Sequence, residues 1–180
     1  YQIDKYSNPS VALSSSDYNW KPQSPGGSIS VGSNTIPMTP CPLGLPSNPY
    51  TFSTGNYFVL ISGGTGTVEA VPVTGGTCTS NASTGTIIIT ARYTHSGTWV
   101  VSSTSSGIQE AIWVASITNL DHARVVIIPS AIITLYAPLF FPRISGDGTR
   151  VGLRGQGERS TNIQLDLDPA SPNTSIWVAN

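Results

Sequence analysis

Charged side chains are scarce in this 180-residue chain: Asp, Glu, Lys and Arg make up 9% of it, against about 25% in an ordinary soluble domain. Between Lys21 and Arg92 the single charged residue is Glu69. The net charge is −1, and phosphate neutralisation needs clustered cations, so the composition argues against a nucleic-acid partner. Abundant Ser, Thr and Asn instead predict a surface wetted by hydroxyl groups, with glycans as a candidate partner.

Long hydrophobic runs are missing as well. The most apolar window, Val125–Phe141, is interrupted by Pro129 and Pro138, so it predicts two strands rather than a membrane span. The chain begins at Tyr1 without a charged and apolar leader, which is the form expected of a secreted protein after signal removal. We therefore expect an extracellular protein without a membrane span.

Residues of the common catalytic and metal sites are few. His95 and His122 are the only histidines, and no third Cys or His stands at ligand spacing, so neither a metal site nor a cofactor is predicted. Asp121 could orient its neighbour His122 beside a serine, but chance placement explains the pair better. Asp166 and Asp168 alternate near the spacing of glycosidase carboxylates, yet the proline that follows favours a turn. No catalytic residue is predicted.

Cysteine is limited to Cys41 and Cys78, both in turn-rich contexts. Two cysteines in an apparently secreted chain most often pair, so we predict a disulfide. Two free, buried thiols are the alternative.

Two sequons, at Asn81 and Asn173, match the acceptor pattern for N-linked glycans and are compatible with surface loops. O-linked modification of the Ser/Thr-rich segments is an alternative. Tryptophan could provide a sugar-stacking surface, although three of the four stand in apolar runs that are typical of a core: Trp20, Trp99, Trp113 and Trp177.

The chain is rich in turns, with 18 Gly and 14 Pro, and this predicts an all-β class. Residues 1–24 form a polar tail with too few apolar side chains for a core. Residues 25–102 hold five or more short strand-like runs between breakers and predict a small antiparallel β-sandwich or barrel. The serine-rich stretch Ser102–Gly107 reads as a linker. Residues 103–180 form the third and last region predicted from the sequence.

The last region begins with a helical pattern and continues as strands. Ile108, Ala111, Ile112 and Ala115 recur at helical spacing. The runs that follow are four to six residues long, rich in Val and Ile, and end at Pro, Gly or Asp.

These segments, GIQEAI, VVIIPS, ITLYAPLFFP and LRGQGERST, resemble the beginning of the pectate-lyase-like right-handed β-helix superfamily. The resemblance covers roughly Pro37–Asp168 and includes the β-rich module that precedes the helix in some secreted bacterial or phage-associated proteins. It implies a capping helix over the N-terminal end of a short, incomplete right-handed β-helix. We expect Ile108, Ile112 and Trp113 to form the buried face of that cap.

A protein of stacked coils needs about three repeats before the apolar face of each repeat is covered by a neighbouring repeat. Only about two coils fit before Asn180. The family's catalytic residues lie on later coils. We therefore expect a structural subunit of an extracellular filament, assembled head to tail by coil stacking and by strand addition from the tail. Val11 and Leu13 would enter an apolar groove of a neighbour, with Ile176 and Val178 in one candidate acceptor. Alternatives are the N-terminal portion of a polysaccharide-degrading enzyme and a trimeric glycan-binding phage spike.

Overall fold

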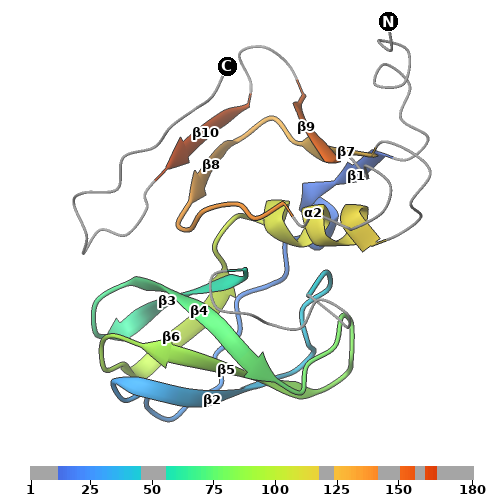
Figure 1. Cartoon of the computed structure of the whole chain (residues 1–180). Coiled ribbons are helices and arrows are strands. Elements are labelled where there is room, and N and C mark those ends of the chain that lie inside the picture. The colour runs from blue at the N-terminus through green and yellow to red at the C-terminus, as the bar shows by residue number, and fades with distance from the viewer. Residues whose placement is uncertain (1–11, 46–55, 118–123, 142–150, 157–160, 166–180) are drawn as a thin grey trace, which may run out of the picture.

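The structure is a computed structural model that describes residues 12–45, 56–117, 124–141, 151–156 and 161–165. This part of the chain is mainly β-structure, with one α-helix, α2 (Ile108–Ile117), and one short 3-10 helix, η1 (Ser15–Tyr18). The helix α2 lies between an antiparallel sheet and a group of short parallel strands (Figure 1). The predicted all-β class is confirmed.

Five antiparallel strands, here called the sheet unit, form one sheet in the order β2-β5-β4-β3-β6, which curls into a half-barrel. In β5, Ile87 and Ile89 are buried whereas Thr90 is exposed. Successive side chains of a strand point to opposite faces, so this alternation gives an apolar inner face and a hydroxyl-rich outer face. The strands are β2 (Gly32–Met38), β3 (Phe58–Thr65), β4 (Glu69–Gly76), β5 (Gly85–Ala91) and β6 (Ser96–Ser103).

Five short strands, here called the parallel unit, form two small sheets with the orders β1-β7-β9 and β10-β8. Every pairing in them is parallel. The chain passes from β7 to β8 and then returns, so that β9 lies on β7 and β10 lies on β8. Each of the two later strands is therefore in parallel register with a strand that precedes it in the chain. The strands are β1 (Ala12–Ser14), β7 (Arg124–Ile128), β8 (Ile132–Leu135), β9 (Val151–Gly155) and β10 (Asn162–Leu165).

The described part of the N-terminal tail pairs with strands of its own chain, and docking of Leu13 on a neighbouring copy stays a prediction. Leu13 pairs with Val126 of β7 and packs against the core of the parallel unit. Further along, Gln23 exchanges two backbone hydrogen bonds with Val101 of β6, at 2.9 and 2.8 Å. The remaining assembly residues expected from the sequence lie outside the described residues: Val11, Ile176 and Val178.

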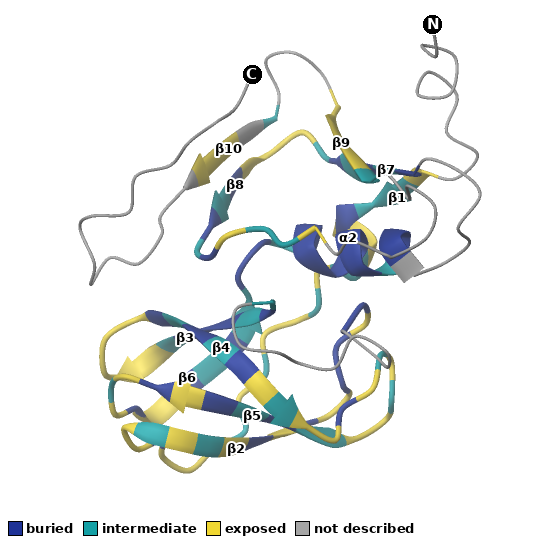
Figure 2. Ribbon diagram, in the orientation of Figure 1, coloured by how far each residue is buried: buried dark blue, intermediate teal, exposed yellow. Residues whose placement is uncertain are grey.

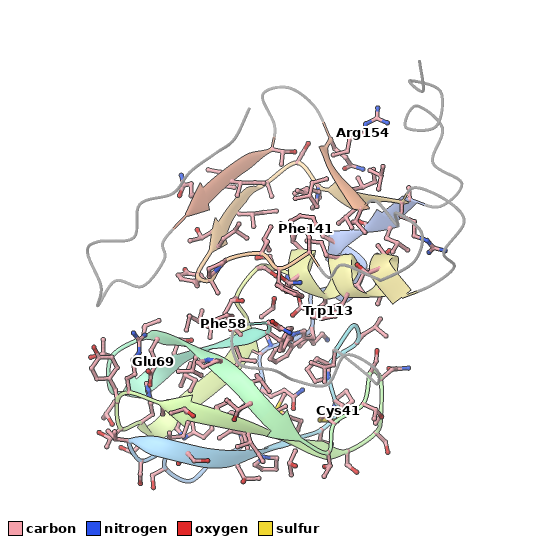
Figure 3. The ribbon with its side chains drawn as sticks, in the orientation of Figure 1. Cys41, Phe58, Glu69, Trp113, Phe141 and Arg154 are labelled. Atoms are coloured by element: carbon pink, nitrogen blue, oxygen red, sulfur yellow. A yellow bond between two sulfur atoms is a disulfide. The ribbon has the colours of Figure 1, made fainter. Side chains whose placement is uncertain are left out.

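Two separate hydrophobic cores meet at α2, which is buried along most of its length (Figure 2). Ile108 and Ile112 are buried as expected, together with Val126 and Ile133 of the parallel unit. Trp113, expected on the same face, instead packs in the core of the sheet unit (Figure 3). Adjacent residues of a helix point about 100° apart, so one helix supplies both cores.

Cys41 and Cys78 form the predicted disulfide. It closes a stretch of 37 positions and lies in the core of the sheet unit, beside the start of β5. Gly85 leaves the space for it, because a Cβ added there would lie 2.6 Å from the Cys41 sulfur and 2.8 Å from the Cys78 sulfur. On the chain-entropy argument a cross-link of this length stabilises the fold by about 4 kcal/mol.

Replacing Gly85 tests how tightly the sheet unit is packed around this disulfide. Gly85→Ala should lower the free energy of unfolding by about 1–3 kcal/mol, since the new methyl group must displace sulfur or backbone. Gly75→Ala is the matched control in β4, where the nearest atom to an added Cβ is the end of the Ile88 side chain at 3.5 Å. Urea unfolding of both variants measures the difference, and equal stabilities would contradict the packing described.

Candidate functional site

The serine-rich stretch before α2 is a buried helix cap rather than a linker. The Ser105 carbonyl accepts the amide of Ile108 at 3.1 Å, and the Ser105 hydroxyl accepts the amide of Gln109 at 2.9 Å. The Ser103 hydroxyl accepts the amides of Ser105 and Gly107, each at 3.2 Å. These bonds satisfy backbone donors that a helix N-terminus leaves unpaired. The segment therefore fixes the direction in which α2 leaves β6.

Glu110, in the first turn of α2, is a fully buried side chain with four hydrogen-bond donors around it. Its Oε1 accepts the Trp20 indole N–H at 2.9 Å and the Tyr57 hydroxyl at 2.8 Å. Its Oε2 accepts the hydroxyls of Ser103 and Ser105, each at 3.2 Å. Four donors from three parts of the sequence thus converge on one carboxyl group, here called the Glu110 cluster.

Burial decides the protonation of this cluster more than its hydrogen bonds do. Removal from water raises the pKa of Glu110, while the donors, led by Trp20, pull it down without cancelling the rise. Burial also raises the pKa of Tyr57 well above its usual value, and the neighbouring Glu110 adds to that rise. Both shifts favour the neutral forms in the folded protein.

A second set of contacts ties α2 to the chain that follows β8. The Gln109 amide donates to the Phe140 carbonyl at 2.8 Å, and its oxygen accepts the Phe140 amide at 2.6 Å. The Phe140 ring packs against Trp113, with centroids 5.7 Å apart. The Tyr136 amide donates to the Thr104 carbonyl at 2.9 Å. Neighbouring residues of α2 therefore clamp the parallel unit and fill the core of the sheet unit.

The other buried carboxylate, Glu69, begins β4 and organises the turn between β5 and β6. It accepts the amides of Arg92 and Tyr93 at 2.9 and 3.2 Å. The His95 Nε2–H donates to Glu69 at 2.8 Å, and the Arg92 Nε lies 3.4 Å away. His95 is itself buried. The pair is therefore placed to hold the turn rather than to meet a substrate.

Several residues weighed in the sequence analysis lie outside the described residues, namely Asp121, His122, Asp166, Asp168, Asn173 and Trp177. Trp99 and Trp113 are core residues, and Trp20 is partly buried in the Glu110 cluster, so these three form no sugar-stacking surface. Asn81 is exposed in a turn with a φ of 62°. The described part of the chain holds no group of three or more His, Cys, Asp or Glu arranged for a metal.

Sequence reasoning missed Tyr57, Gln109 and Glu110. The available signal was a charged residue among apolar ones at the start of a helix, preceded by hydroxyl side chains. A carboxylate at that place points to a cap, but its distant partners Trp20 and Tyr57 are visible only in the fold.

Comparisons with protein-family models, with curated proteins and with solved structures found no match. In the described ranges, no helix has the length and apolar character that crossing a membrane requires.

The Gln109 clamp can be tested by removing its amide. Gln109→Ala should cost about 1–3 kcal/mol, since it leaves both backbone groups of Phe140 without their partner. Ser130→Ala is the control, because it removes an exposed hydrogen bond to the Gln156 carbonyl in the parallel unit and should change stability by less than about 0.5 kcal/mol. Urea unfolding measures both. If the two variants were equally stable, the clamp would contribute nothing measurable.

Proposed function

We propose that this chain is a structural capping module, which closes one end of a right-handed β-helix of the pectate-lyase-like type in an extracellular assembly. The observation that carries the proposal is the parallel register of two successive turns, with β9 on β7 and β10 on β8, and with α2 across one end. Chains that coil repeatedly stack equivalent strands in parallel, and each coil buries its neighbour.

Burial of the inward positions supports a stack that is closed at one end. Val126 is 0% exposed and its partner on the next turn, Leu153, is 37% exposed. Ile133 is 5% exposed and its partner Ile163 is 39% exposed. In each pair the first turn, which faces α2, is covered, and the second turn is less covered. The gradient supports further coils on the side of β9 and β10.

The closed end changes the kind of assembly proposed. Continuous head-to-tail stacking of coils requires a stackable surface at both ends. Here the β7 edge is paired with β1, and α2 packs against the interior of the first turn. We therefore propose an assembly in which this module terminates the coils and does not repeat within them.

An extracellular location is part of the same proposal. The Cys41–Cys78 disulfide is typical of proteins that fold in an oxidising compartment. The low charge and the hydroxyl-rich outer face of the sheet unit fit such a surface.

The second candidate is the N-terminal portion of a polysaccharide-degrading enzyme or of a glycan-binding spike. The partly exposed inward residues Leu153 and Ile163 favour it as well, because the resemblance puts the family's active residues on later coils. Assays for unsaturated products or new reducing ends from pectin-like polymers separate the candidates. We expect no release by this chain, and release would favour the enzyme.

Adjacent residues of β9 provide a test of the coil itself. Leu153→Asp should destabilise the parallel unit by about 1–2 kcal/mol, because position 153 is in register with the buried Val126 on the same face of the paired strands. Arg154→Asp is the control at the next position of β9, which is in register with Ile127 on the opposite face of the paired strands, and it should leave the stability nearly unchanged. Hydrogen exchange of the β7 amides reports the effect. Equal protection in both variants would show that β9 is not a second turn of a coil.

A further inference from the structure

The Glu110 cluster lies where α2 joins the sheet unit. Trp20 precedes the sheet unit in the chain, Tyr57 stands directly before β3, and Ser103 is the last residue of β6. All three donate to a carboxyl group carried by α2. The cluster is therefore an interface contact, and moving α2 away from the sheet unit would return Glu110 to water.

The groups that face Glu110 are almost all uncharged. From the start of β3 the facing titratable group is Tyr57, and from the β6 side the facing groups are the serine hydroxyls. The loop after Cys41 faces Glu110 with Gly44, which has no side chain to titrate; a Cβ added there would lie 2.8 Å from the Glu110 Cβ. Trp20 contributes only its indole N–H. Within the described residues Glu110 forms no ion pair, so dipoles alone would stabilise its anion.

We propose that Glu110 is a proton-controlled latch, which holds α2 and the parallel unit on the sheet unit more tightly in acid than at neutral pH. The inference rests on this junction and does not depend on the proposed function.

The hydrogen bonds of the cluster can accommodate a proton on one oxygen. The Trp20 indole N–H can only donate, so Oε1 must remain an acceptor. On the other side, the Ser103 hydroxyl already accepts the amides of Ser105 and Gly107, which fills both of its lone pairs, whereas the Ser105 hydroxyl accepts one amide, that of Gln109, and can accept once more. A protonated Oε2 can therefore donate to the Ser105 hydroxyl while Trp20 and Tyr57 keep their bonds to Oε1. The neutral cluster keeps its contacts and avoids burying a charge.

The direction of the pH dependence follows from the raised pKa of Glu110. The pKa of Glu110 lies above its usual value of 4.5 in the folded protein and returns to that value when the junction opens. The closed form thus holds the proton to higher pH than the open form does. Closure is strongest below pH 4.5, weakens as the pH rises, and levels off above the folded pKa. The raised pKa of Tyr57 works in the same direction at alkaline pH, because loss of its proton would also weaken closure.

Hydrogen exchange of α2 in the full chain, followed from pH 4 to pH 8 and corrected for the intrinsic exchange rate, measures this opening. We expect the opening constant of α2 to rise about tenfold for each unit by which the pKa is shifted. Amides of β5, in the middle of the sheet unit, should not follow this rise. A flat profile for α2 in the parent protein would overturn the proposal.

Two variants and one control link the profile to this carboxyl group. Glu110→Gln should remove the dependence, and Asp17→Asn, which removes an exposed carboxyl group on η1, should retain it. Trp20→Phe takes one donor from the anion, so the rise should extend to higher pH. If Glu110→Gln fails to fold, Trp20→Phe decides the matter. A pH dependence that persists in Glu110→Gln would show that another group titrates. A rise that Trp20→Phe does not extend to higher pH would show the same.

Discussion

The burial of one short helix between two cores is the constraint on which the described structure depends. α2 has ten residues, too few for a stable isolated helix in water. Its position is therefore set by what it packs against, with Ile108 and Ile112 on one side and Trp113 on another. Because neither core is complete without it, the sheet unit and the parallel unit are coupled through α2 and do not behave as domains joined by a linker.

The scarcity of charge makes the buried carboxylates more informative. Three acidic residues fall within the described residues, and two of them, Glu69 and Glu110, are buried. A carboxylate can accept about four hydrogen bonds, so a single side chain can gather donors from several segments. Glu69 gathers those of the β5–β6 turn and Glu110 those of the α2 junction. In both places the acid organises backbone and side chains in the interior of the fold.

The sequence predicted the features that depend on local patterns. Alternation in segments such as β5 indicated an antiparallel sheet, Cys41 and Cys78 indicated the disulfide, and the spacing of Ile108 and Ile112 indicated the inner face of α2. It did not predict contacts between distant segments. Nothing local marks Trp20 or Tyr57 as partners of Glu110, and a serine-rich stretch has the same composition in a linker and in a buried cap. Nothing local indicated that Leu13 pairs with Val126 of β7, which lies far along the chain.

The pairing of β1 with β7 covers the edge of β7 that faces away from β9. Parallel strands need a long crossover, and here Ala12 pairs with Val125, 113 positions later, with the whole sheet unit and α2 between them. Closing so long a loop costs conformational entropy, which three paired residues cannot offset alone. Further contacts come from η1, whose backbone lies so close to Gly107 that a side chain there would meet the Ser15 carbonyl oxygen. The Gly107 φ of 85° likewise favours glycine. The covered edge of β7 therefore depends on the contacts of η1 and α2 as well as on the three residue pairs of β1 with β7.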